Sequence, residues 1–146
     1  SSIAGKIGFP LTSGYVSSKF ALEGLSESMA YEIEQFGIKV ILIEPGVIKT
    51  NFDKNLKIGK RVTIDHNSSY REMTQKRISG FKPRFERGSP PIEVAKVILK
   101  AITSENPSEL RYLVGNDAFK LMKIKDNIPD TEFRKLVIKS VLQDIN

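Results

Sequence analysis

Apolar residues recur at helical spacing over the first quarter of the chain. We predict one long helix that begins at Thr12 or Ser13, which are suitable N-cap residues, and ends at Gly37, a residue typical of helix C-termini. At 100° per residue, five apolar side chains of this helix fall within about 80° of arc. We expect this stripe to press on a sheet, and it consists of Leu22, Leu25, Met29, Ile33 and Phe36.

A nearly continuous apolar run follows this helix. Residues 38–44 read Ile-Lys-Val-Ile-Leu-Ile-Glu, as expected for a parallel strand covered on both faces, and the run ends at Pro45-Gly46. Residues 110–114 predict a second, shorter strand. A strand that follows a long helix indicates a doubly wound α/β fold with a parallel sheet. Ligands of such sheets bind at the carboxyl ends of the strands.

Residues 51–88 show no sustained periodicity. One short helix is predicted there, because residues 69–72 form a capping box, and Gly80 is expected to end it. A connection of this length commonly forms a lid or a binding loop.

The rest of the chain predicts three helices. Ser89 is a suitable N-cap for the first, which should reach residue 104 and has Pro90 and Pro91 in its opening turn. The tail, residues 117–146, predicts two further helices separated near Pro129.

The positive charge of the chain is concentrated in residues 51–88. The 146 residues carry a net charge of +6, and this segment holds ten Lys and Arg against four Asp and Glu. The charge indicates either an anionic substrate or carrier or simply a solvated lid surface. No nucleic-acid-binding module is recognisable, so we expect no nucleic-acid partner. Interleaved apolar residues favour a hydrophobic substrate body, and they are Phe52, Tyr70, Met73, Ile78, Phe81 and Phe85.

The composition excludes several kinds of site. The chain has no cysteine, which excludes disulfides, thiolate catalysis and cysteine-ligated metals and is compatible with a reducing cytoplasm. The single histidine, His66, lies in a polar stretch and is interpreted as a loop residue. No run approaches the roughly 20 apolar residues of a membrane span. We therefore expect a cytoplasmic protein with no metal site and no membrane span.

Tyr15 and Lys19 are four residues apart at the start of the long helix, so their side chains share one face. An ammonium group near a phenol stabilises the phenolate and brings proton transfer into the neutral pH range. Ser2, on a loop upstream, could hold the same substrate oxygen by a hydrogen bond. By itself the pair is weak evidence, since a half-buried aromatic and a surface cation often begin a helix.

Several motifs in fixed order change this assessment. Ser-Ser-x-Ala-Gly at the start is followed by Tyr-x-x-x-Lys opening a helix, and a strand then leads into Pro-Gly-Val-Ile-x-Thr at residues 45–50. Over residues 1 to 52, this series resembles the short-chain dehydrogenase/reductase family. The resemblance implies a Rossmann-like fold and a function as an NAD(P)-dependent oxidoreductase that interconverts an alcohol and a carbonyl. The apolar residues and the charge of residues 51–88 favour a hydrophobic or acyl-type substrate.

The resemblance also implies roles for individual residues. Ser2 and Tyr15 would be catalytic, with Tyr15 as general acid/base, and Lys19 would act in catalysis and hold the nicotinamide ribose. The loop that contacts the nicotinamide would be Pro45, Gly46, Val47, Ile48 and Thr50, with backbone groups of Val47 or Ile48 facing the carboxamide. The cofactor would be NAD or NADP, with NADP slightly favoured and the choice left open.

Parts of the family pattern have no counterpart in this sequence. The glycine-rich phosphate loop, the residue that selects NAD or NADP and a catalytic asparagine all precede the serine in that family. We therefore interpret residues 1–146 as the C-terminal half of one Rossmann-like domain, with residues 51–88 as substrate lid and 117–146 as helical tail. We expect the N-terminal dinucleotide-binding half to be absent from this chain and the chain alone to be inactive.

Two alternatives stay open. The protein could be a non-catalytic binding or regulatory protein of this fold, or a dehydratase or epimerase that uses the same tyrosine. The small residues on one side of the Tyr15 helix predict a homodimer or homotetramer formed through that helix.

Overall fold

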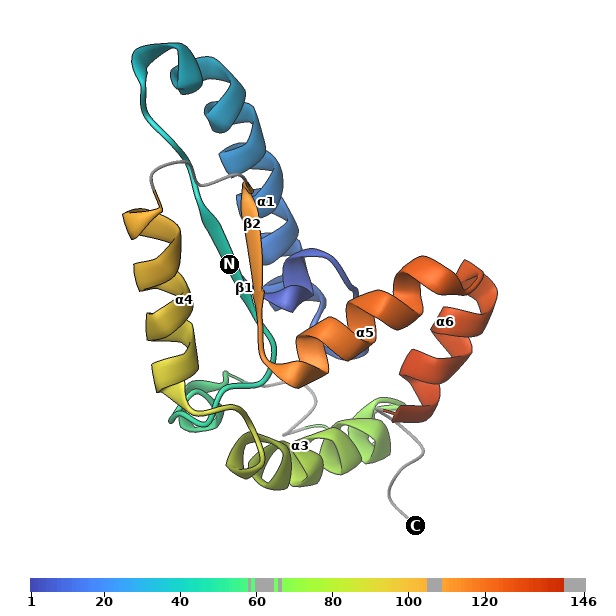
Figure 1. The fold of residues 1–146 in the computed structure, drawn as a ribbon. Helices are drawn as coiled ribbons and strands as arrows, with labels where there is room; N and C mark the ends of the chain where they lie inside the picture. Colours follow the sequence, from blue (N-terminus) through green and yellow to red (C-terminus); the bar gives the residue numbers. More distant parts are fainter. Residues whose placement is uncertain (58, 60–64, 66, 105–108, 141–146) are drawn as a thin grey trace.

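The computed structural model describes residues 1–57, 59, 65, 67–104 and 109–140; His66 lies outside this part. A two-stranded sheet and several helices alternate along the chain, which confirms the predicted α/β class (Figure 1). In order, the elements are the 3-10 helix η1 (Ile3–Gly5), α1 (Ser13–Ile33), the 3-10 helix η2 (Glu34–Phe36), β1 (Leu42–Pro45), the 3-10 helix η3 (Asp53–Asn55), α3 (Arg71–Glu86), α4 (Pro91–Thr103), β2 (Arg111–Val114), α5 (Asn116–Asn127) and α6 (Asp130–Ile138).

The two strands are parallel, as predicted. Leu42 lies opposite Arg111 and Pro45 opposite Val114. The predicted strand over residues 38–44 is shorter at its start, because the described part of the chain offers residues 38–41 no partner before β2 begins. Figure 1 shows α1 and α4 on either side of the strands, with α3 across the end toward which both strands point. The carboxyl ends of the strands therefore face α3.

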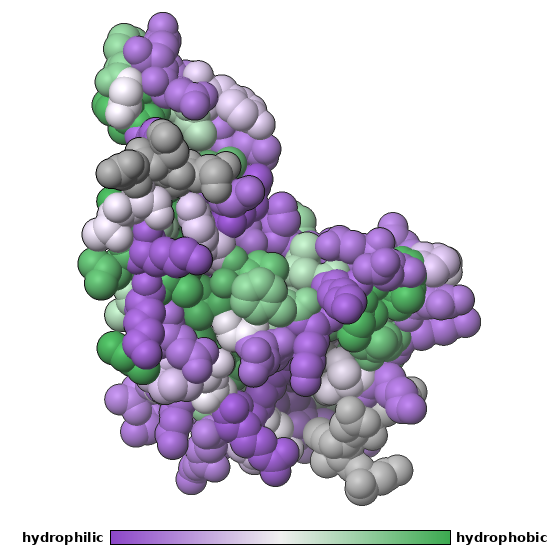
Figure 2. Space-filling model, viewed as in Figure 1, coloured by the Kyte–Doolittle hydropathy of each residue, from purple (hydrophilic) through white to green (hydrophobic). Residues whose placement is uncertain are grey.

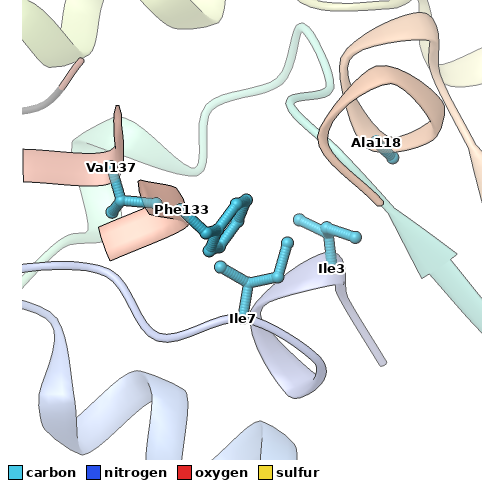
Figure 3. Close-up of a cluster of buried hydrophobic side chains, with 5 residues drawn as sticks. All are labelled: Ile3, Ile7, Ala118, Phe133 and Val137. Atoms are coloured by element: carbon cyan, nitrogen blue, oxygen red, sulfur yellow. The ribbon is translucent and has the colours of Figure 1, made fainter. Parts of the chain in front are cut away.

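The main hydrophobic cluster joins the start of the chain to its last two helices. Ile3 and Ile7 point toward Phe133 of α6, with Ala118 of α5 and Val137 beside them (Figure 3). All five side chains are buried. This packing fixes η1, and with it the residue that precedes η1, against the C-terminal helices.

The helical stretch predicted up to Gly37 is formed by α1 followed by the 3-10 helix η2, and the prediction of the sheet-facing side of α1 was wrong. Helix α1 starts at Ser13, and after η2 the chain turns at Gly37, whose φ of 73° lies in the left-handed region that favours glycine. However, Leu25 of the predicted stripe is 59% exposed, whereas Glu23 is only 5% exposed. Glu23 faces the sheet because Arg111 of β2 lies there, with its Nε 2.9 Å from Glu23 Oε2. Ion pairing, rather than apolar contact, orients this helix.

Helix α3 is longer than predicted. Tyr70 occupies its N-cap position without a side-chain hydrogen bond, so the predicted capping box is wrong. The helix also continues through Gly80 and includes Pro83. A glycine within a helix costs only about 1 kcal/mol relative to alanine. Aromatic packing beyond Gly80, described below, outweighs that local preference.

The remaining helices match their predicted positions closely. Helix α4 begins at Pro91 with Pro90 as N-cap, so Ser89 does not cap it; the backbone of Ser89 is bonded to another loop instead. Helices α5 and α6 are separated at Pro129, as predicted. None of the described helices is long and apolar enough to cross a bilayer.

Candidate active site

One cavity lies where β1 ends and α1 begins, and it has a volume of about 380 Å³. It is lined by residues from η1, α1, the loop after β1, α3 and the start of α5. Every site residue predicted from the sequence lines it, namely Ser2, Tyr15, Lys19, Pro45, Gly46, Val47, Ile48 and Thr50. The fold thus brings three separate segments of the chain to a single hollow.

Ser2 is held rigidly at the edge of this cavity. It is buried, it caps η1, and its Oγ accepts a hydrogen bond of 3.2 Å from the backbone N–H of Ala4. The same hydroxyl donates to the carbonyl oxygen of Pro45 across 3.4 Å. The long donor bond leaves the hydroxyl hydrogen able to turn toward a ligand in the cavity.

Tyr15 and Lys19 face the cavity from the first two turns of α1. Lys19 Nζ lies 5.4 Å from the centroid of the Tyr15 ring, within the range of a cation–π contact. Tyr15 is 37% exposed and lines the cavity. The one-face placement predicted from the spacing is thus observed.

The loop after β1 is fixed by backbone hydrogen bonds on both sides. Val47 N–H donates to Asp117 Oδ2 over 2.8 Å, and the carbonyl oxygen of Val47 accepts from Ser89 N–H over 2.9 Å. Lys49 N–H donates to the carbonyl oxygen of Ser89, also over 2.9 Å. Both backbone groups of Val47 are therefore occupied by protein partners.

Asp117 is the site residue that our sequence analysis missed. It lies in the first turn of α5, directly after β2, and its carboxylate lies against Gly46 so closely that a Cβ atom at position 46 would overlap with it. A signal was present, because a polar residue just past a parallel strand lies at the same sheet edge as residues 45–50.

Aromatic rings connect Tyr15 to α3. The Tyr15 and Phe52 rings meet edge to face, with centroids 5.6 Å apart, and Phe52 lies 5.6 Å from Phe85. Phe81 continues the series at 6.4 Å from Phe85. These rings form an apolar wall of the cavity.

Two acidic residues, Glu23 and Glu44, lie between α1 and the sheet. Arg111 contacts Glu23 and Glu27 of α1 and also Glu44, whose Oε1 is 3.4 Å from the arginine Nε. Burial, together with the negative charge of Glu23, raises the pKa of Glu44 to about 7. This cluster attaches α1, and hence Tyr15 and Lys19, to the strands.

Within the described residues, no group of three or more His, Asp or Glu side chains is arranged to hold a metal ion.

Among known proteins, the family model described as short chain dehydrogenase matches residues 1–61. An uncharacterized oxidoreductase of Schizosaccharomyces pombe is 37% identical over 133 residues, which are 91% of this chain and 54% of that protein. The 17-beta-hydroxysteroid dehydrogenase type 1 of Mus musculus is 32% identical over 129 residues, covering 88% of this chain and 37% of that protein.

A solved structure of a short-chain dehydrogenase also matches this chain. The crystal structure of a short-chain dehydrogenase from Streptomyces avermitilis matches with a TM-score of 0.61 and 30% sequence identity, over 93% of this chain and 48% of that one. The chain spans about half the length of the curated relatives it matches. Its fold is accordingly the matching half of a Rossmann-like domain, and the chain belongs to the short-chain dehydrogenase/reductase family of NAD(P)-binding oxidoreductases.

Proposed function

We propose that the protein is an NAD(P)-dependent oxidoreductase that interconverts an alcohol and a carbonyl. The observation that carries this proposal is the shared cavity: Ser2, Tyr15 and Lys19 line it together with the loop of residues 45–50. A tyrosine beside a lysine and a serine provides a proton donor, a cation and a hydrogen-bond donor for one substrate oxygen.

Each side chain has a definite role in carbonyl reduction. The Tyr15 hydroxyl donates its proton to the carbonyl oxygen as that oxygen gains negative charge, and in alcohol oxidation it takes the proton back. The Lys19 ammonium stabilises the phenolate that remains on Tyr15. The Ser2 hydroxyl turns from the Pro45 carbonyl to the same substrate oxygen and stabilises its developing charge.

The residues present fit a nicotinamide cofactor. When bound, NAD(P)H would supply the hydride. Lys19 would hold the ribose, and Thr50 would lie near the carboxamide or the phosphates. Since both backbone groups of Val47 are occupied, we assign the carboxamide contact to Ile48 rather than to Val47. A dinucleotide-binding half, with the phosphate loop that residues 1–146 lack, would complete the cofactor site.

The proposed substrate is hydrophobic or acyl-type. Phe52, Phe81 and Phe85 all line the cavity, and the first of these rings contacts Tyr15. An apolar body placed against these rings excludes water around the oxygen that accepts the proton, which strengthens the hydrogen bonds made to it.

The test is Tyr15→Phe in the full-length protein, with the absorbance loss of NADH or NADPH followed during reduction of a panel of aryl and alkyl ketones. We expect turnover to fall at least about 100-fold, because the proton donor is removed. Tyr31→Phe is the matched control, since Tyr31 is an exposed tyrosine of the same helix that does not line the cavity. Undiminished turnover in Tyr15→Phe would exclude the proposed role.

We also propose that the protein associates through α1. The small residues Ser17, Ala21, Gly24 and Ser28 form an exposed face that would let a second helix approach closely. Light scattering should show that Gly24→Gln shifts a dimer or tetramer toward monomer; an unchanged mass would contradict this arrangement.

A further inference from the structure

The candidate active site adjoins a second cavity along α3. This second cavity, which we call the basic cavity, has a volume of about 750 Å³ and is lined by α3, residues 88–89 and the first turns of α5. Arg77 and Arg84 line both cavities. The two arginines are seven residues apart on α3, which is about two turns, so they lie on one face of the helix. The two guanidinium groups therefore lie where the two cavities adjoin.

The basic cavity carries a strong excess of positive charge. Its basic residues are Lys76, Arg77, Arg84, Arg87 and Lys120, and Asp117 is its one acidic residue among those described. Asp117 already accepts the hydrogen bond from Val47, and Lys76 is paired with Glu72 at 2.9 Å. In the part of the chain that the structure describes, no ion pair involves the other four basic residues.

Arg77 is the most enclosed of these cations. Its Cζ lies 4.7 Å from the centroid of the Phe81 ring, and its Nε is buried without a hydrogen-bond partner among the described residues. Burial, with the charge of Arg84 as a second cause, lowers the pKa of Arg77 to about 10. A partly buried cation beside a second cation is unfavourable, and a bound anion would relieve that cost.

We propose that Arg77 and Arg84 form an oxyanion-binding subsite that selects carbonyl or alcohol substrates with an apolar body and a carboxylate or phosphate group. This inference rests on the proposed function. The body lies against Phe52, Phe81 and Phe85 in the active-site cavity, and the anionic group lies between the two guanidinium groups, directed into the basic cavity. The chemistry is bidentate recognition of oxygen pairs by arginine.

The anion belongs to the substrate and not to the cofactor. Of the residues of the nicotinamide half, Lys19, Ile48 and Thr50 line only the active-site cavity, whereas Val47 lines both cavities with its backbone N–H and carbonyl already bonded to Asp117 and Ser89. Most of the remaining lining of the basic cavity comes from α3 and the start of α5 (Figure 1). Hydrophilic side chains gather over α3 on the face shown in Figure 2, next to an apolar area.

The first experiment uses the full-length protein, NAD(P)H and three matched ketones: 4-acetylbenzoate, its methyl ester and 4-acetylphenyl phosphate. We expect kcat/KM to be at least about tenfold higher for the anionic ketones than for the ester. Arg84→Gln and Arg77→Gln should each lower that ratio about tenfold. Arg84 is exposed, so its variant tests the subsite even where loss of Arg77 disturbs folding. Whichever anionic ketone, the carboxylate or the phosphate, has the higher kcat/KM relative to the ester identifies the anionic group that the subsite prefers.

Lys82→Gln is the matched control, because it removes a positive charge from α3 at a side chain that lines neither cavity. It should leave the anion-to-ester ratio unchanged. Equal kcat/KM for ester and anions in the unsubstituted protein, or an equal fall of the ratio in Lys82→Gln and Arg84→Gln, would overturn the subsite.

A binding measurement separates this inference from the proposed function. Calorimetric titration with 4-butylbenzoate should show binding that is at least about tenfold weaker in Arg84→Gln, while the affinity for NAD(P)H is unchanged. If no ketone is reduced but this loss occurs, the proposed function fails and the subsite stands. If ketones are reduced and 4-butylbenzoate binds equally to both proteins, or if only NAD(P)H binding weakens, the subsite fails and the proposed function stands.

Discussion

The backbone N–H of Val47 donates to Oδ2 of Asp117 over 2.8 Å, joining two positions that are 70 residues apart in the sequence. Because Asp117 lies in the first turn of α5 and Val47 follows β1, the bond fixes the proposed nicotinamide-contacting loop relative to the second strand. Asp117→Ala should lower kcat/KM of the full-length protein by up to about 100-fold, since a small displacement of a positioning loop has large effects on rate. The assay is steady-state reduction of an aryl ketone.

The control for this variant is Asp126→Ala, an exposed aspartate of the same helix. It should leave kcat/KM unchanged. If Asp117→Ala retains the full kcat/KM, the loop is positioned without this bond.

Gly46→Ala tests the same contact from the other side. A Cβ atom at position 46 would overlap with the Asp117 carboxylate, so the carboxylate must move, and we expect its bond to Val47 to weaken or break. We expect a loss of kcat/KM similar to that of Asp117→Ala, and the double variant should lose little more than either single variant. Gly8→Ala is the control, because no atom lies within 4 Å of a Cβ placed there. Additive losses in the double variant would show that the two residues act independently.

Lys19→Gln should lower kcat about 100-fold and raise the KM for NAD(P)H, because one ammonium is proposed both to stabilise the Tyr15 phenolate and to hold the ribose. Stopped-flow single-turnover measurements separate the two effects from product release. Lys39→Gln, at an exposed lysine that does not line the active-site cavity, should change neither constant. An effect on KM alone would leave Lys19 as a cofactor-binding residue only.

The buried carboxyl group of Glu44 should make stability depend on pH. Its pKa is raised to about 7 in the folded protein, so between its ordinary value of 4.5 and about 7 the folded protein binds a proton that the unfolded chain releases. The free energy of unfolding should therefore decrease as pH rises through this range, by on the order of 1 kcal/mol from this group. Urea denaturation of the full-length protein at pH 5 and pH 8 measures this decrease in the free energy of unfolding.

Glu44→Gln should remove that part of the pH dependence, because the amide does not titrate. The control Glu132→Gln, at an exposed carboxylate of α6, should retain it. Identical pH dependence in Glu44→Gln and the unsubstituted protein would contradict the assignment.

The site was more predictable from the sequence than the packing around it. Tyr15 and Lys19 meet because helical spacing fixes their relation locally. Ser2 and residues 45–50 could be placed through motifs in a fixed order. Asp117 was missed because its partner lies 70 residues away, and such a pairing is decided by the sheet rather than by neighbours in the chain.

The wrong predictions for the side of α1 and the end of α3 also arise from contacts between residues far apart in the sequence. Counting apolar residues placed Leu25 against the sheet, but the ion pair of Glu23 with Arg111 turned the other side of α1 inward. Gly80 reads locally as a helix end, yet α3 continues to Glu86, where Phe85 packs against Phe52. Local signals decided the elements themselves, and tertiary contacts decided their faces and limits.

The ring of Tyr15 packs edge to face against Phe52, which in turn packs on Phe85 of α3. The proposed proton donor and the proposed substrate-selecting surface therefore share one side chain. Replacing residues 51–88 by the corresponding segment of a relative would also change the neighbour of the proposed acid. Variation at position 52 should therefore be constrained by reactivity and not only by the shape of the substrate.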